Sequence, residues 1–371
     1  MGLWLIGLIA VIAVLAAVIV LRRTARVPQH MAPSEEAPGQ EAPADAPTAG
    51  AETEAETEAE TEAEAEAEAE AATVRAETLR GLKEVALDAA LPWAVLTAPP
   101  ADDLCTEVAA ALLGIADKPN YAPRRPMQLP RLMQAINDET ASRTALSQII
   151  AGDPALAGNL LRLANSPFYR HTPDPIESID RAVAMLGTEG LRSMIAAALL
   201  QPVFRVSGGS FAHFGEVTWE HSLYAASAAE NHAALVDRAD PFAAQLLALV
   251  LGLATIVVFS VSKDAFLARQ RKPEAETIAT LIDAHGISVA RQIAASWELS
   301  ERIDTALGEQ AGKPSTPLGR ALYFGEFIGA LAVLRAHGRV DDQTASAALK
   351  AARISPSIAE RVWGRLGFMP G

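Results

Sequence analysis

The sequence predicts an all-α protein in which a helical bundle follows one transmembrane helix and a disordered acidic linker. Three observations lead to this prediction. An unbroken apolar run opens the chain, and a low-complexity repeat of glutamate and alanine follows it. From residue 76 onwards, apolar residues recur at spacings of three and four, which is typical of amphipathic helices. An alternating strand pattern with hairpin turns does not occur in the sequence, so we expect no β-sheet.

Residues 1–26 have the composition of a membrane anchor. The stretch from Leu3 to Leu21 holds no charged side chain. As a helix it would span roughly 28 Å, close to the hydrocarbon thickness of a bilayer. Arg22, Arg23 and Arg26 follow it and no basic residue precedes it, so the positive-inside rule places the folded domain in the cytoplasm, anchored to the inner membrane by a single pass. A cleaved signal peptide is the alternative, but the run lacks a basic n-region and is longer than a usual h-region.

Residues 27–75 have the composition of a flexible tether. Five prolines are spaced through the first half, and the second half reads ETEAETEAETEAEAEAEAEA. Glutamates at i, i+2 and i+4 repel one another on a helix, and no lysine compensates for them. We therefore predict a disordered linker that holds the folded domain away from an anionic membrane. A flexible chain of this length has an r.m.s. span of roughly 40 Å.

The net charge of −14 comes almost entirely from this linker. Residues 27–72 hold fourteen acidic residues and no Lys or Arg, whereas the rest of the chain holds 31 acidic and 31 basic residues. The folded part is therefore nearly neutral, which disfavours binding to a nucleic-acid backbone. The single cysteine, Cys105, cannot form an internal disulfide, which suits a reducing compartment.

The remaining chain divides into three helical parts. Residues 76–123 form an N-terminal helical extension that is interrupted by prolines, and a further group of prolines separates it from the main domain at residues 124–335. Residues 336–371 supply C-terminal helices that complete the bundle. Trp297 is expected to anchor the core between helices.

The stretch AGDPALAGNLLRLANSPFY, from Ala151 to Tyr169, predicts a short helix with a sharp exit. Asp153 is a good N-cap, and Pro154 fits the first helical position, where a backbone N–H has no partner. Asn165-Ser166-Pro167 stops the helix, because proline disfavours helical geometry in the residue before it and the polar side chains can bond the freed backbone groups.

The next helices are marked by their own caps. Ser178 is placed to cap a helix that starts beside it, with an acidic residue in the first turn. Gly187 is placed to end this helix, and Thr188 can cap the one that follows.

These pieces occur in an order that resembles the HDOD domain family. LPRLMQAI, the stretch above, and IESIDRAVAMLGTEGLRSMIAAALL come first, and WEHSLYAA, the apolar run to Phe259 and GISVARQIAASWEL follow. The resemblance covers about 124–335, and Arg170 departs from it, since the family usually has glycine there. It implies an HD-like helical bundle that serves as an output module of bacterial signalling proteins and is related to HD-type metal phosphohydrolases.

The resemblance also locates the metal ligands that an HD-type hydrolase needs. His221 stands at the first histidine position, but Gly252 and Leu253 occupy the places of the His-Asp pair, and no His-Asp dipeptide occurs in the chain. Ser288 stands where related sequences often place another histidine, and Glu309-Gln310 lies near a further histidine pair. Imidazole and carboxylate ligands are what such a site requires. We therefore expect no metal, no cofactor and no catalytic residue, and we interpret His221 as a helix-surface or hydrogen-bonded core histidine.

We accordingly predict a non-catalytic signalling or regulatory interaction module, tethered at the cytoplasmic face of the membrane and binding a protein partner that the sequence does not identify. The resemblance suggests an interaction surface at Arg162, Asn165 and Ser166, and at Trp219 and His221. Two alternatives stay open: a diverged metal-dependent phosphohydrolase or cyclic-nucleotide phosphodiesterase, and a protein that binds a nucleotide messenger without hydrolysing it.

Overall fold

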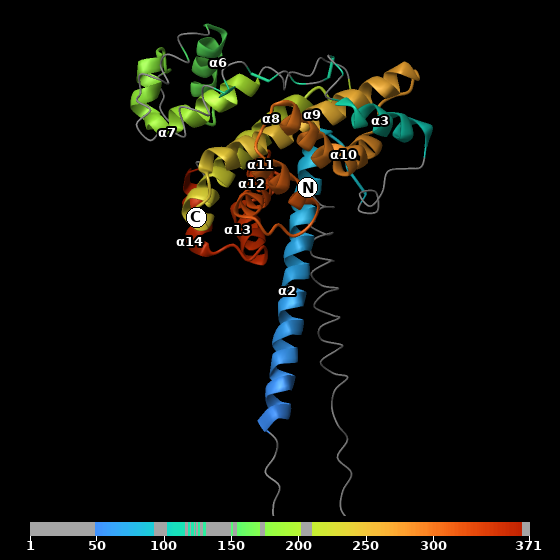
Figure 1. The fold of residues 1–371 in the computed structure, drawn as a ribbon, viewed down its shortest axis with the longest axis vertical. Coiled ribbons are helices and arrows are strands. Elements are labelled where there is room, and N and C mark those ends of the chain that lie inside the picture. Colours follow the sequence, from blue (N-terminus) through green and yellow to red (C-terminus); the bar gives the residue numbers. More distant parts are fainter. Residues whose placement is uncertain are drawn as a thin grey trace, which may run out of the picture. The chain divides into compact units, whose positions relative to one another are not determined.

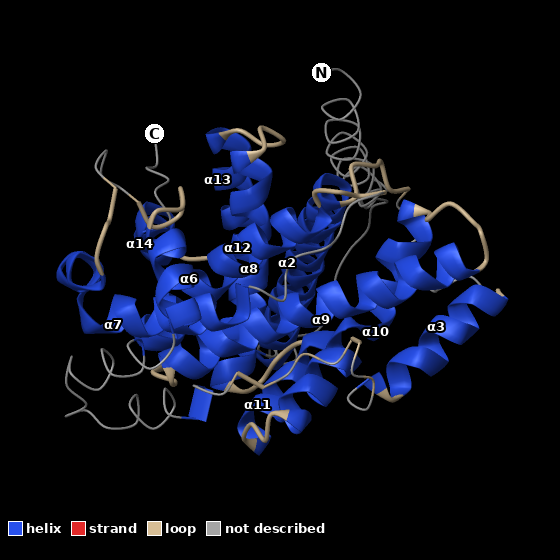
Figure 2. Cartoon of the chain, turned by 90° about the horizontal axis from the view of Figure 1, so that it is seen from above, coloured by secondary structure: helices blue, strands red, loops and turns tan. Residues whose placement is uncertain are grey.

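The computed structural model consists of helices and connecting loops, and the described residues contain no strand (Figure 2). The structure describes residues 49–92, 102–115, 118, 120–121, 123, 125–126, 129–130, 150, 154–170, 175–201 and 210–365. The chain divides into two compact units, Met1–Glu58 and Ala59–Gly371. The described part of the first unit is the beginning of one helix. The all-α prediction is confirmed.

The described helices are named as in Figure 1. In chain order they are α2 (Ala49–Ala86), α3 (Asp103–Leu113), α6 (Pro154–Ala164), α7 (Ile179–Leu200), α8 (Phe214–His232), the π-helix η4 (Ala233–Asp237), α9 (Pro241–Ala268), α10 (Ala275–Ser296), α11 (Glu301–Gly308), the 3₁₀-helix η5 (Glu309–Ala311), α12 (Pro317–Ala336), α13 (Asp342–Ala351) and α14 (Pro356–Arg365).

Helix α9 forms the centre of the core. Asp240 caps it by accepting a hydrogen bond from the backbone N–H of Ala243, and Pro241 occupies the first helical position. Its side chains are apolar on nearly all faces, which is the pattern of a helix surrounded by protein. By length and composition α9 and α12 could cross a membrane, but 89% and 78% of their most apolar windows are buried in the protein, as in core helices.

Helices α8 and α12 pack with almost no side chains between them. A Cβ atom built on Gly325 would lie 2.6 Å from the backbone oxygen of Ala225 and 2.7 Å from the Cβ of Ala229. One built on Gly329 would lie 2.7 Å from the backbone nitrogen of Ala225. Alanine on one helix and glycine on the other therefore allow their backbones to touch.

Helix α7 follows its predicted caps, whereas Asp153, the predicted N-cap of α6, lies outside the described residues. Ser178 caps α7 by accepting a hydrogen bond from the N–H of Arg181, and Gly187 has a φ of 69° that divides α7 into two helical parts. Ser193 of α7 donates to Glu230 at 2.7 Å and accepts from Gln245 at 2.8 Å through its carbonyl oxygen. These two contacts attach α7 to α8 and α9.

The N-terminal extension is part of the same core. Asp102 caps α3, and Gln292 of α10 bonds the last turn of α3, with Nε2 donating to the carbonyl of Leu112 at 2.9 Å. Trp297 is 1% exposed, and its indole N–H donates to the carbonyl of Pro123 at 2.9 Å. Trp297 thus anchors the core as predicted, and its hydrogen bond ties the loop after α3 to the end of α10.

Residues 49–75 differ from the predicted disordered linker, because α2 continues through the acidic repeat without a break (Figure 1). Alanine and glutamate are both strong helix formers, and this propensity outweighs the repulsion between the glutamates. Ion pairs from Glu68 to Lys313 at 2.5 Å and from Glu64 to Arg353 at 3.8 Å add to it. The predicted boundary at residue 76 lies inside this helix, and the linker residues 27–48 lie outside the described part of the chain.

The C-terminal helices α13 and α14 form a second apolar cluster with α12. Trp363 and Val362 of α14 and Leu349 of α13 are buried against side chains such as Phe327 and Leu331. Ala228 of α8 belongs to the same cluster. That residues 336–371 complete the bundle stays a prediction.

We expect Gly325→Ala to destabilise the protein by about 1–3 kcal/mol, because the added methyl group has no space at the contact of α8 and α12. The measurement is chemical denaturation of the full-length protein in mild detergent. Gly158→Ala is the matched control: Gly158 is exposed in α6 with open space at its Cβ position, so alanine should stabilise by up to about 1 kcal/mol. Equal effects of the two substitutions would contradict the close contact.

Candidate functional site

A cavity of about 940 Å³ lies among helices α2, α8, α9, α10 and α12 and the short η5. Four positions that the sequence analysis singled out line it together: His221 of α8, Gly252 of α9, Ser288 of α10 and Gln310 of η5. These residues are far apart in the chain, so the fold itself assembles them. The candidate site is therefore this cavity.

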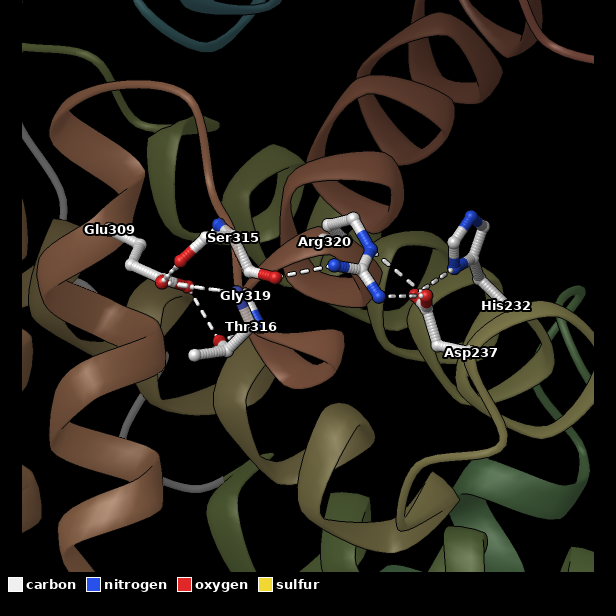
Figure 3. Close-up of polar contacts among 7 residues, drawn as sticks. All are labelled: His232, Asp237, Glu309, Ser315, Thr316, Gly319 and Arg320. Carbon is white, nitrogen blue, oxygen red and sulfur yellow. Dashed lines mark hydrogen bonds and ion pairs between the residues drawn. The ribbon is translucent and has the colours of Figure 1, made fainter.

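The other two singled-out positions are used elsewhere. Leu253 is fully buried in the core. The carboxylate of Glu309 accepts hydrogen bonds from the backbone N–H groups and hydroxyls of Ser315 and Thr316, at distances between 2.5 and 3.2 Å (Figure 3). Glu309 therefore organises the turn into α12.

His221 is a hydrogen-bonded core histidine, which was one of the two predicted roles. It is 6% exposed, and Nε2 lies 3.1 Å from the backbone oxygen of Glu326 in α12. A carbonyl oxygen can only accept, so Nε2 carries the proton and donates it. The carboxylate of the same Glu326 lies 3.9 Å from Nε2.

A partly buried arginine from α2 completes this cluster. One guanidinium nitrogen of Arg75 donates to the backbone oxygen of Tyr323 at 2.5 Å, and the guanidinium carbon lies 3.5 Å from the centre of the Tyr323 ring. Burial lowers the pKa of Arg75, while Tyr323 and Glu326 oppose that shift. Burial raises the pKa of Glu326, and His221 and Arg75 counteract part of the effect.

Sequence analysis did not identify Arg75, Tyr323 or Glu326. Arg75 was placed at the end of the linker, although it is the first basic residue after ten glutamates and begins the apolar face of α2. Tyr323 and Glu326 lie on α12 without any motif around them. The side chains become a cluster only through the contact between α8 and α12.

The residues at the cavity do not fit a divalent metal. Gly252 has no side chain to offer, and His221 already donates to a carbonyl oxygen. Within the part of the chain that the structure describes, no group of three or more His, Cys, Asp or Glu side chains could hold a metal ion. The guanidinium of Arg75 also places a permanent positive charge beside the one carboxylate near His221, and this charge opposes a second cation.

The other charges that line the cavity are paired. Lys83 of α2 forms an ion pair with Asp283 of α10. Arg291 of α10 binds Asp304 of α11 with two hydrogen bonds of 2.8 and 2.7 Å. The cavity wall is thus close to neutral.

The exit of α6 is an internal clamp. Nδ2 of Asn165 donates to the backbone oxygens of Leu161 at 2.9 Å and Ile176 at 2.8 Å, and its Oδ1 accepts from the N–H of Ile176 at 2.8 Å. The carbonyl of Ser166 accepts from the N–H of Arg170 at 2.9 Å, so the turn forms with arginine in place of the family's glycine. Asn165 therefore holds two backbone segments together.

The other predicted surface residues, Arg162 and Trp219, do not take part in this clamp. Arg162 is exposed on α6 and bonds Asn159, and Trp219 is half-buried on α8 against the core. None of the α6 residues lines the cavity, whereas His221 does. That Arg162, Asn165, Ser166, Trp219 and His221 form an interaction surface stays a prediction. The anchor residues Leu3, Leu21, Arg22, Arg23 and Arg26 lie outside the described residues.

A second polar cluster joins the end of α8 to the start of α12 (Figure 3). Asp237 lies in the π-helix η4, 3.2 Å from Nδ1 of His232, and accepts from Arg320 at 2.6 and 2.9 Å. The centre of the His232 ring lies 4.3 Å from the centre of the Phe324 ring. Burial lowers the pKa of His232, and Asp237 opposes that shift. These contacts connect η4, which directly follows α8, to the first turn of α12.

Comparison with known proteins gives one family match and several solved structures of low sequence identity. The family model described as "HDOD domain" matches residues 122–311. A solved structure named "Putative metal-dependent phosphohydrolase" from Shewanella amazonensis is 16% identical, with 71% of this chain and 97% of that chain covered and a TM-score of 0.48. An HDOD domain protein with unknown function from Geobacter sulfurreducens is 19% identical, with coverage of 70% and 97% and a TM-score of 0.45. No curated protein matches the chain.

We expect Asn165→Ala to destabilise the protein by about 1–3 kcal/mol, because the N–H and the carbonyl of Ile176 lose their partner and the carbonyl of Leu161 keeps only the backbone N–H of residue 165. Asn165→Asp should be no less destabilising, since a carboxylate would face two carbonyl oxygens. The exposed neighbour Arg162→Ala is the control and should change stability by less than about 0.5 kcal/mol. Thermal denaturation measures all three variants, and a neutral Asn165→Ala would show that the clamp is dispensable.

Proposed function

Because the chain belongs to the HDOD domain family, we propose that it is a non-catalytic interaction module of a bacterial signalling or regulatory system, tethered at the cytoplasmic face of the membrane. One observation carries the non-catalytic part of this proposal. The positions that would hold the metal of an HD-type hydrolase meet at one cavity, where they supply Gly252, Ser288 and Gln310 beside a histidine that bonds a backbone oxygen.

The chemistry of this cavity supports recognition rather than turnover. Metal-assisted hydrolysis needs several imidazole or carboxylate ligands that converge on an ion and on its bound water. His221 and Glu326 are a single pair, with the Nε2 of His221 and the carboxylate 3.9 Å apart. A chain that keeps the bundle but lacks these ligands can still present the helical surfaces and the groove that binding a partner requires.

The residues that precede the folded domain in the chain support the proposed membrane tether. The run from Leu3 to Leu21, with Arg22, Arg23 and Arg26 after it, supports a single membrane pass with the domain in the cytoplasm. The acidic residues between this run and the domain would keep the domain off an anionic surface, since like charges repel. The partner protein would then be recruited to the membrane face.

We expect the purified full-length protein to hold far less than one equivalent of any transition metal. With added Mn²⁺ it should hydrolyse bis(p-nitrophenyl) phosphate no faster than its His221→Asn variant. The physical reason is that the Gly252 and Leu253 positions provide no ligand. Elemental analysis and a colorimetric assay measure the two quantities. Stoichiometric metal together with activity that depends on His221 would restore the phosphohydrolase hypothesis.

We expect the full chain to stay in the membrane fraction after a high-salt wash and a chain that lacks residues 1–26 to be soluble. Burial of the apolar run in the bilayer is independent of ionic strength, whereas attachment through charges is not. Protease digestion of inverted and right-side-out vesicles then reports the side on which the domain lies. Recovery of the shortened chain in membranes would contradict the anchor.

A further inference from the structure

The cavity of the candidate site has fixed walls and an exposed rim on α10. Helix α2 is one of the walls, and Thr78, Ala86 and Leu87 of this helix are at most 7% exposed, so it is built into the core. Most lining residues that are exposed to solvent lie on α10, among them Ser288 and Ala295. The volume of about 940 Å³ lies within the range of small-molecule sites, which is about 300–1,000 Å³. The cavity is therefore large enough for a small molecule with every helix in place.

Apolar side chains form much of the cavity wall. They come from four helices: Leu79 and Leu82 of α2, Phe214 of α8, Leu251 of α9, and Ile282 and Ile287 of α10. Transfer of a hydrocarbon group from water to such a surface is favourable. The cavity therefore suits a ligand with an apolar body.

The charged side chains at the wall disfavour a ligand with a net charge. Lys83 and Arg291 are each held by an aspartate, so an anion would have to break an ion pair to gain either cation. The other two charged residues that line the described cavity, Arg75 and Glu326, have opposite signs. An anion would meet the charge of Glu326 and a cation that of Arg75, and a buried charge beside a like charge is unfavourable. We therefore expect an uncharged ligand.

Hydrogen-bonding groups of both kinds are available near Glu326. Because Nε2 of His221 carries a proton, Nδ1 of the neutral ring is an acceptor, and no described group bonds it. The Glu326 carboxylate likewise accepts no hydrogen bond from the described residues and lies 3.9 Å from Nε2. Arg75 donates one N–H to the carbonyl of Tyr323, and its other N–H groups bond no described residue. The hydroxyl of Thr218, one turn before His221, can donate or accept.

We propose that this cavity binds an uncharged small molecule with an apolar body and an amide group at one end. An amide offers N–H donors to Glu326 and His221 and an oxygen acceptor to Arg75, and it does so without a net charge. This inference goes beyond the proposed function, because it assigns a ligand to the cavity whether or not a protein binds to the outer surface. It differs from the nucleotide-messenger hypothesis, since phosphates carry negative charge.

The test compares three probes that share a phenyl ring and differ in the charge of the other end: 3-phenylpropanamide, 3-phenylpropanoate and 3-phenylpropylamine. We expect the full-length protein in mild detergent to bind the amide about tenfold more tightly than either charged probe, because only the amide brings no unpaired charge into the cavity. Titrations followed by saturation-transfer NMR measure the three affinities.

A matched pair of substitutions locates the binding. Ser288→Trp places an indole at the exposed rim of the cavity and should abolish binding of the amide. Ser357→Trp adds the same indole to an exposed position of α14 that does not line the cavity, and it should bind the amide as the wild type does. The comparison also corrects for any probe that enters the detergent.

Two further substitutions should reverse the preference for charge. Glu326→Gln removes the negative charge at nearly constant shape, so this variant should bind 3-phenylpropanoate about tenfold more tightly than the wild type does. Arg75→Gln removes the positive charge and should favour 3-phenylpropylamine by about the same factor. A purely structural role of either residue would weaken all three probes together. Circular dichroism shows whether each variant folds, and the Ser288→Trp comparison tests the site if one does not.

Several results would overturn the proposal. These are wild-type binding of a charged probe as tight as that of the amide, binding of the amide that persists in Ser288→Trp, and no binding of any probe. Displacement of the amide by a cyclic dinucleotide would show that a charged messenger fills the cavity, which also overturns it. The metal and hydrolysis measurements use none of these probes, so failure here leaves the proposed function unaffected.

Discussion

The backbone contact between α8 and α12 is the constraint on which the site depends. Glycine at positions 325 and 329 lets the two helices touch at Ala225 and Ala229. This contact brings His221 within hydrogen-bond distance of the carbonyl of Glu326 and places Tyr323 one turn away on the same helix. The contact between His221 and Glu326 at the edge of the cavity follows from this spacing, and the cluster around Asp237 lies where α8 ends and α12 begins.

The positive charge near Glu326 in this chain is the guanidinium of Arg75, whereas a metal-binding relative would have a divalent ion. A bundle of this family that binds metal needs several ligands around a divalent ion. Here the guanidinium of Arg75 stacks on Tyr323, and its charge counteracts part of the rise that burial causes in the pKa of Glu326. Burying a carboxylate is costly unless a cation or hydrogen bonds accompany it. The arginine that α2 supplies can satisfy this requirement without the reactive water that a metal would bring.

The sequence allowed the fold to be predicted wherever local signals and tertiary packing agree. The caps at Ser178 and Gly187, the stop at Asn165 and the buried Trp297 all follow from residue chemistry that acts over a few positions. The positions expected to hold the His-Asp pair could be assigned to Gly252 and Leu253 because both stand inside a recognisable apolar helix. Arg75 could not be placed, because its role depends on α12, about 250 residues later in the chain. The acidic repeat was judged by charge repulsion, whereas the helix propensity of alanine and glutamate prevails.

The acidic repeat has a further consequence because its period of two residues meets a helical period of 3.6. Successive glutamates are rotated by about 200° around the axis of α2, so their charges are distributed over the whole circumference. The first part of the helix therefore has no uncharged side with which to settle on a bilayer or on another protein. Side chains other than glutamate that contact the folded domain begin only with Val74 and Arg75. The composition of the repeat thus restricts this part of the helix to contacts made through charge, such as the ion pairs of Glu64 with Arg353 and of Glu68 with Lys313.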